Sequence, residues 1–228
     1  IARVFSQQAK LLYPHGDIDT TVDPLAPPIY FPTLTAPVWI DGYEEGWEDV
    51  AAVVMENPAD NESNIRYRSG FYDNQLHFFI EVTDSEVVYN NPAKFSLTDG
   101  DRLVLLVGGQ KKYIFSTAAP GKVVTKSIDE NSNSVSESSI DAYWQDSSQG
   151  YNLEFSLPMS LTGGRLSFYV IDQNSDGNSR YGPHVRSKAV VPPRFTIQPE
   201  QLARQLDIFN QAGQRHKIID PYLWTLAE

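Results

Sequence analysis

The sequence predicts a mainly β protein, an antiparallel β-sandwich with a short helix near each end of the chain. Between Val38 and Asp172, apolar and polar residues alternate in several segments, which is the pattern of half-buried strands. These segments recur about every ten residues, and no helical pattern separates them. The chain has 228 residues, 41% of them hydrophobic, which is enough for a sizeable core.

The N-terminal region is predicted to contain a helix and a linker. Residues 1–13 carry apolar side chains at a spacing that suits one face of a helix, and Pro14 and Gly16 end it. Residues 17–37 contain five prolines. They exclude a helix and favour an extended linker that lies over a surface.

A β-hairpin is the clearest local prediction. Residues 75–83 alternate between apolar and polar side chains, with Phe79 as an apolar exception on the polar face. Asp73-Asn74, directly before them, is typical of a tight turn, so residues 65–72 are expected to supply the partner strand.

Further strands complete the predicted sandwich. They are expected at residues 102–107, 111–116, 121–128, 140–145, 152–157 and 165–172. The inward faces of the strands supply the predicted core residues Leu76, Phe78, Ile80, Leu103, Leu105, Leu153, Phe155 and Phe168. Glu81 and Glu154 fall on the opposite faces and are expected to meet solvent. Residues 129–139 are polar and rich in Ser, which indicates a mobile hairpin loop.

After Arg194 the pattern changes again. Pro199 opens a second predicted helix over residues 199–212, and its apolar stripe should pack on the first helix or on the sandwich. Residues 215–226 resemble a strand that Asp220-Pro221 breaks or confines to an edge. The expected regions are a juxtamembrane helix and Pro-rich linker (1–35), a ligand-binding β-sandwich (36–196), and a helix and strand (197–228).

Composition and charge exclude several classes of function. The net charge of −11 argues against a nucleic-acid binder, which needs a surplus of Lys and Arg. The absence of Cys excludes disulfides, thiolate metal sites and Cys nucleophiles. The four His residues show no metal-ligand spacing, and no GxSxG or phosphate-loop motif occurs, so we expect no intrinsic catalysis. The chain starts at Ile1 and is expected to be an excised fragment or a mature form.

One motif suggests a cation. In Asp172-Gln173-Asn174-Ser175-Asp176-Gly177, oxygen-bearing side chains alternate before a glycine, as in the first half of a calcium loop. Asp172, Asn174 and Asp176 are the candidate ligands. The other interpretation is a turn after a strand, in which these side chains bond backbone amides.

Aromatic residues supply the candidate ligand platforms. Trp144 is flanked by Tyr143, Asp141 and Gln145, which combine a flat aromatic face with groups that bind hydroxyls. Trp144 also shares a face with Ile140, so it is either an exposed platform or a buried core residue. Trp39 and Trp47 flank an acidic segment and leave the same two options open: sugar stacking or core packing.

Four segments resemble family 9 carbohydrate-binding modules and their relatives. Residues 36–47 (APVWIDGYEEGW) resemble the opening IDG…W signature, and residues 71–84 resemble the D…LYV…V.D hairpin. Residues 100–106 resemble the next strand and residues 172–180 the closing turn, in the family's order. The resemblance implies a β-sandwich, and some members of this family bind sugars and calcium.

The C-terminal segment resembles a different kind of protein. Residues 206–228 (LDIFNQAGQRHKIIDPYLWTLAE) are similar to the R.rVvD..GwvLA segment in extracytoplasmic sensor regions of bacterial histidine kinases, with Pro221-Tyr222 in place of a polar-Gly turn. Together with the N-terminal helix and linker, it resembles the input region of a membrane-anchored sensor kinase. One type that it resembles is the kinase associated with dedicated sortase systems in proteobacteria.

Two hypotheses for function follow from these resemblances. The first is a non-catalytic, periplasmic ligand-sensing domain of a two-component sensor histidine kinase whose parent protein lies in the inner membrane. The alternative is a carbohydrate-binding module of a secreted glycoside hydrolase. Both imply a small-molecule or glycan ligand and require no cofactor, while calcium binding and homodimerisation remain open.

Overall fold

The structure is a computed structural model that describes residues 28–57, 60–91, 99–108, 111–128, 134–174, 177–184, 191–197, 218–219 and 225–227. The helices predicted over 1–13 and 199–212, and the break predicted at Asp220-Pro221, lie outside these residues. Two six-stranded sheets form the described part, and every strand pair within them is antiparallel. The predicted antiparallel β-sandwich is therefore confirmed.

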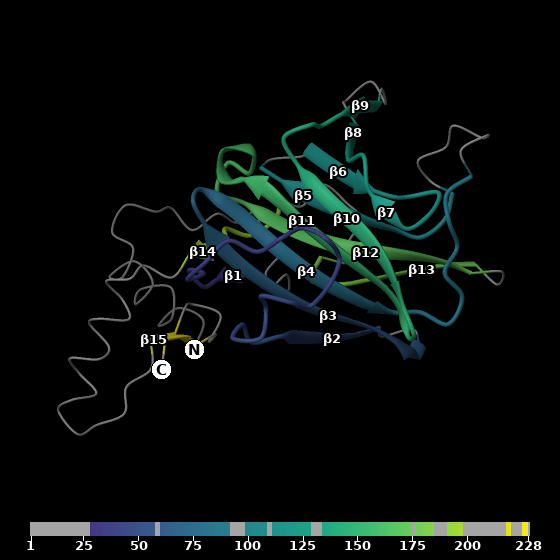
Figure 1. Ribbon diagram of the computed structural model, residues 1–228, viewed down its shortest axis with the longest axis horizontal. Helices are drawn as coiled ribbons and strands as arrows, with labels where there is room; N and C mark the ends of the chain where they lie inside the picture. The colour runs from purple at the N-terminus through teal and green to yellow at the C-terminus, as the bar shows by residue number, and fades with distance from the viewer. Residues whose placement is uncertain are drawn as a thin grey trace, which may run out of the picture.

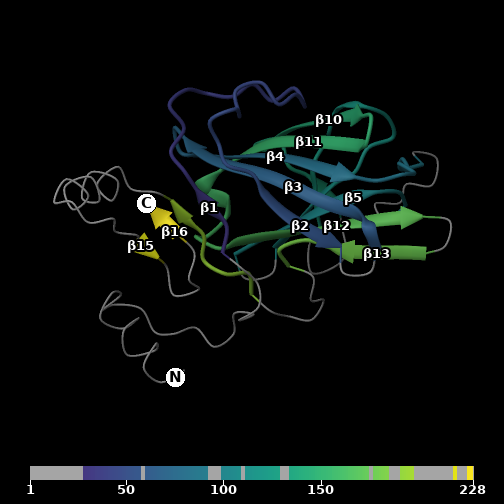
Figure 2. The ribbon, with the colours of Figure 1, turned by 90° about the horizontal axis from the view of Figure 1, so that it is seen from below.

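The two sheets lie one upon the other (Figures 1 and 2). The first sheet has the order β2 (Val53–Asn57), β3 (Asp60–Tyr72), β4 (Gln75–Thr83), β11 (Gly150–Pro158), β10 (Asp141–Ser147) and β7 (Gly121–Lys122). The second has the order β13 (Gly177–Tyr181), β12 (Leu166–Asn174), β5 (Arg102–Val107), β6 (Lys111–Phe115), β8 (Lys126–Ile128) and β9 (Ser134–Ser136). A single 3-10 turn, Met159–Leu161, follows β11 among the described residues.

The predicted hairpin forms as expected from its turn residues. β3 and β4 pair up to Tyr72 and Gln75, and the two residues between them are Asp73 (φ 45°) and Asn74 (φ 61°). Two successive residues with positive φ define the turn whose twist matches that of paired strands. Asp and Asn are the non-glycine residues that tolerate this conformation best.

The core is made by the residues that alternation placed there. All eight predicted core side chains are fully buried. Aromatic rings connect the strands across the interior: Phe78 stacks on Phe155 with centroids 4.8 Å apart, and the centroids of Phe115 and Phe155 are 4.5 Å apart. Because a slip of one residue would reverse every side chain, this burial confirms the predicted register.

One predicted strand is wrong. Residues 121–128 form two short strands in different sheets, since β7 pairs with β10 and β8 pairs with β6. The intervening Val123 and Thr125 are buried, so this segment crosses from one layer to the other. Part of the predicted loop at 129–139 is also strand: β9 pairs with β8.

The described flanks form small sheets of their own. β1 (Tyr30–Phe31), within the predicted Pro-rich linker, pairs in parallel with β14 (Thr196–Ile197). Phe31 is fully buried and lies 5.1 Å from Phe78, so the end of the linker contributes to the main core. Near the C-terminus, β15 (Ile218–Ile219) pairs with β16 (Thr225–Ala227). No helix in the described part of the chain is long and apolar enough to cross a membrane.

Candidate functional site

The segment 38–50, called here the anchored loop, lies over the outer face of the first sheet. Its Trp47 is fully buried and packs on Phe79 of β4, with ring centroids 6.3 Å apart. Phe79 is the apolar residue that breaks the alternation of β4, and its partner explains the break. Of the two interpretations of Trp47, the structure supports core packing.

Glu154 of β11 holds the anchored loop in place. Its Oε2 accepts hydrogen bonds from the backbone N–H groups of Asp41 (2.9 Å) and Gly42 (2.8 Å). Its Oε1 accepts one from Nε1 of Trp47 at 2.8 Å. The carboxylate therefore satisfies three donors from one loop.

The expectation that Glu154 meets solvent is wrong. The side chain points away from the core, as alternation predicts, but the anchored loop covers it completely. Burial raises the pKa of its carboxyl group from 4.5 to about 7, while the hydrogen bonds from Trp47 and from the loop backbone act in the opposite direction.

The anchored loop approaches β10 so closely that one position requires glycine. Gly42 has φ +84°, and a Cβ atom built there would lie 2.6 Å from Cβ of Gln145 and 3.2 Å from Cδ1 of Tyr143. Asn152 of β11 adds a hydrogen bond from its Nδ2 to the Gly42 carbonyl at 3.1 Å. Residues 40–43 (IDGY) thus lie against the outer faces of β10 and β11.

Arginine side chains hold the other end of the anchored loop. Arg68 of β3 is 5% exposed, and its Nε donates to the Val50 carbonyl at 3.2 Å. The same guanidinium bonds Glu44 of the loop and, at 3.0 Å, Glu81 of β4. Glu81 is half-exposed, and Arg66 also pairs with it. A planar guanidinium with several donors suits such a junction.

Two aromatic side chains of the anchored loop stand in solvent. Trp39 is 84% exposed and Tyr43 is 53% exposed. They are the largest exposed hydrophobic side chains in the described part of the chain. Asp41, Glu44 and Glu45 surround them in sequence and supply carboxylate oxygens at the surface. An anchored loop that presents aromatic faces beside acceptors has the chemistry of a ligand-binding surface.

The sequence-predicted platform at Trp144 does not fit the structure. Trp144 is 1% exposed and stacks on the Tyr151 ring with centroids 3.8 Å apart, so no face of the indole can meet a ligand. The reason is alternation, which turns Trp144 inward together with Ile140 and Ala142.

The remaining candidates of that platform stay on the outer face of β10. Tyr143 and Gln145 are half-buried and lie against Gly42, so they border the anchored loop. Asp141 is exposed and pairs with Lys122 at 2.9 Å. Trp39 and Tyr43 therefore replace Trp144 as the aromatic part of the candidate surface. The sequence signal for this surface was the position of Trp39 beside the segment Asp41-Gly42-Tyr43.

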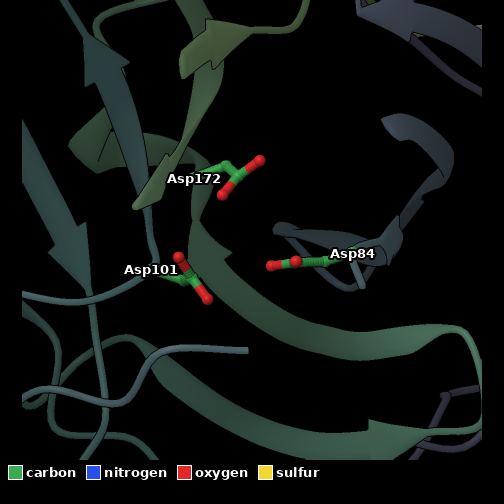
Figure 3. A group of neighbouring side chains, drawn as sticks. All are labelled: Asp84, Asp101 and Asp172. Carbon is green, nitrogen blue, oxygen red and sulfur yellow. The ribbon is translucent and has the colours of Figure 1, made fainter. Parts of the chain in front are cut away.

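The structure also gathers three buried aspartates, called here the aspartate cluster. Asp84 follows β4, Asp101 precedes β5, and Asp172 lies in β12. One carboxylate oxygen of each lies within 4.8 Å of the others, and Figure 3 shows the side chains directed toward one another. Burial raises the pKa of Asp101 to about 7; hydrogen bonds from the Gln173 and Val88 backbone oppose this rise, and the nearby Asp84 adds to it.

The cluster differs from the predicted calcium loop. Asp172 belongs to it, but Asn174 donates a 3.4 Å hydrogen bond from its Nδ2 to Asp172 Oδ2, as in a strand-ending turn. Asp176 lies outside the described residues. Asp84 and Asp101 were not among the candidates, although each borders a predicted strand. Sequence spacing could not indicate that these borders meet.

The chain shows distant likenesses to known proteins. No family model and no curated protein matches the chain. The chain is similar to a family 9 carbohydrate-binding module from Caldicellulosiruptor kristjanssonii in complex with glucose, with TM-score 0.48 and 14% identity over 76% of this chain and 97% of that one. For a structure of such a module with cellotriose, the values are 0.45, 16%, 73% and 98%. Identities this low do not carry a ligand from those modules to this chain.

Proposed function

We propose that the chain is a non-catalytic recognition domain that binds a neutral saccharide at a surface formed by Trp39, Tyr43, Tyr143 and Gln145, called here the recognition surface. The observation that carries the proposal is the 84% exposure of Trp39 at the edge of a loop that Glu154 fixes to the sheet. An anchored loop loses little conformational freedom on binding, which favours affinity.

The chemistry of the recognition surface fits a saccharide. Aromatic faces stack on the C–H faces of sugar rings, and carboxylate and amide groups bind the hydroxyls. The acidic residues around Tyr43 and the net charge of −11 disfavour glycans that carry carboxylates or sulfates. The ligand class is therefore a neutral oligosaccharide.

The biological context is the finer part of the proposal. We place the domain in the periplasmic input region of an inner-membrane, two-component sensor histidine kinase. Support comes from the similarity of residues 206–228 to sensor regions and from the Pro-rich segment before the sandwich. A module of a secreted glycoside hydrolase is the second candidate, supported by the resemblance of residues 36–182 to family 9 modules. Sugar-dependent autophosphorylation of the parent protein separates the two.

Calorimetric titration tests the recognition surface. Glucose and cello-oligosaccharides are the first probes, followed by a panel of other neutral oligosaccharides. We expect saturable binding that Trp39→Ala weakens about five- to thirtyfold, because one stacked ring contributes roughly 1–2 kcal/mol. Val54→Ala is the matched control, since Val54 is an exposed hydrophobic residue of β2 outside the surface. Equal affinity of wild type and Trp39→Ala, or no binding at millimolar saccharide, contradicts the proposal.

A further inference from the structure

The three aspartates of the cluster point to a second site, for a metal ion. We propose that Asp84, Asp101 and Asp172 bind a divalent cation of the calcium type, which joins the two sheets at one end of the sandwich. This inference is independent of saccharide binding, because the cluster shares no residue with the recognition surface.

The ligands come from both layers of the sandwich. Asp84 directly follows β4 of the first sheet, whereas Asp101 directly precedes β5 and Asp172 lies within β12 of the second. In Figure 3 their carboxylates converge on one small region between three separate segments. Oxygens bound to one calcium ion at about 2.3–2.6 Å can be up to about 5 Å apart. The limit of 4.8 Å within the cluster fits that span without rearrangement.

Asp84 supplies a second, independent observation. Its side chain is 6% exposed, and Oδ1 accepts a hydrogen bond from the Glu86 backbone N–H at 2.8 Å. Its Oδ2 is buried and accepts no hydrogen bond from any residue that the structure describes. Buried carboxylate oxygens are normally bonded. The Tyr151 hydroxyl, which interacts electrostatically with all three aspartates, is also buried without a hydrogen-bond partner among the described residues.

Charge leads to the same conclusion. Burying several carboxylates together is unfavourable unless a cation or a bound proton compensates them. Neither Asp84 nor Asp101 forms an ion pair within the described ranges. Arg102 interacts electrostatically with Asp101, but its Nη1 donates to the Gly100 carbonyl at 2.7 Å instead of to a carboxylate. A divalent ion would balance the charge of Asp84 and Asp101, neither of which forms an ion pair with a described arginine.

The donor set selects a hard cation. All three ligands are carboxylates, which suit calcium or magnesium and not the ions that prefer nitrogen or sulfur. Backbone N–H groups orient the ligands in advance: Gln173 donates to Asp101 Oδ1 at 2.8 Å and Val88 to Asp101 Oδ2 at 2.6 Å. Calcium accepts an irregular set of six to eight oxygens more readily than magnesium, so water and the Tyr151 hydroxyl can complete it.

Thermal unfolding of the metal-free whole chain tests the proposal. After removal of metals with a chelator, calcium is added up to the millimolar range, with magnesium in a parallel series. We expect calcium at about a hundredfold excess over its Kd to raise the Tm by roughly 5–10 °C, and magnesium to raise it less. No rise with calcium overturns the proposal, and an equal rise with magnesium overturns the assignment to calcium.

Asp84→Asn provides the specific variant. It should abolish the rise in Tm with calcium, and without metal it should be at least as stable as the wild type, because one buried negative charge is gone. Glu56→Gln, which removes an exposed charge on β2, should keep the full calcium response. A full calcium response in Asp84→Asn contradicts the assignment.

Terbium luminescence keeps the test decisive if Asp84→Asn fails to fold. Terbium takes the oxygen ligands of calcium, and Tyr151 with its stacked neighbour Trp144 should sensitise its emission in the wild-type protein. We expect emission that calcium displaces. Absence of sensitised emission, or emission that calcium does not displace, overturns the proposal.

Discussion

At the scale of single residues, Glu154 illustrates what alternation predicts and what it misses. The pattern of β11 places Leu153 and Phe155 inside and Glu154 outside, and all three point as expected. Exposure is a different property, because it depends on whether another segment covers the outer face. Phe79 on the same face hinted at such a cover, but the sequence does not say that Trp47 provides it.

Removing the Glu154 carboxylate should loosen the anchored loop. Glu154→Ala leaves three N–H donors without their partner, two of them on the loop backbone. We expect a loss of about 3–5 kcal/mol in the free energy of unfolding, measured with urea. The control Glu45→Ala removes an exposed carboxylate from the same loop and should change stability by less than about 0.5 kcal/mol. Similar losses in both variants would contradict the anchoring role.

Glu154 also predicts a pH dependence of stability. Its pKa rises from 4.5 to about 7 on folding, so the folded state binds this proton more tightly. The associated stabilisation is present below pH 4.5 and is lost as the pH rises through about 7. It amounts to something on the order of 3 kcal/mol. The difference in unfolding free energy between wild type and Glu154→Gln should therefore shift across this window; parallel pH curves would show that the hydrogen bonds cancel the effect of burial.

The two tryptophans Trp144 and Trp39 should respond in opposite ways to the same substitution. Trp144→Ala empties a buried site stacked on Tyr151 and should cost about 3–5 kcal/mol of stability. Trp39→Ala removes a side chain that is 84% exposed and should cost less than about 0.5 kcal/mol while it weakens saccharide binding. Urea denaturation of both variants measures the contrast. Comparable losses of stability would mean that Trp39 packs on the protein.

At the scale of elements, the sequence predicts features that depend on neighbouring residues, but not those that depend on residues far apart in the chain. The β3–β4 hairpin was predictable because Asp73-Asn74 and the flanking alternation lie within one short stretch. The division of residues 121–128 between two sheets was not, since it depends on which strands lie beside them. The aspartate cluster is similar, because its members are far apart in the sequence, whereas the predicted ligands Asp172, Asn174 and Asp176 are close together in it.

The hairpin turn offers a stabilising substitution. Asn74 has φ 61°, a conformation that glycine adopts at no steric cost. Its backbone carbonyl accepts the Met159 N–H at 2.9 Å, a bond that the substitution keeps. Asn74→Gly creates the preferred Asp-Gly turn and should raise the free energy of unfolding by about 0.5 kcal/mol. Asn74→Val should lower it in the same urea assay; a stabilising valine would contradict the turn geometry.

At the scale of the whole molecule, the sequence predicted the sandwich and its core but not what covers the sandwich. Core positions such as Phe78 and Phe155 follow from strand periodicity and burial, which are properties of each strand. The recognition surface depends on how residues 38–50 lie across β4, β10 and β11, which is a property of the assembled sheet. Alternation already allowed a buried Trp144, which the structure shows, but it could not indicate that Trp39 and Tyr43 of the anchored loop are the exposed aromatic residues.

The pairing of β1 with β14 has a mechanical consequence. Tyr30 lies beside Thr196 and Phe31 beside Ile197, in parallel, with a further bond from the Thr196 N–H to the Ile29 carbonyl at 3.1 Å. Tension applied through residues 28 and 197 would pull the two strands in opposite directions along their axes, so their hydrogen bonds would resist together in shear. We expect a force-extension measurement with these attachment points to show rupture of this short ladder before the sheets extend. Until this ladder ruptures, the applied tension would pass from residue 28 to residue 197 through β1 and β14, and it would largely bypass the two main sheets.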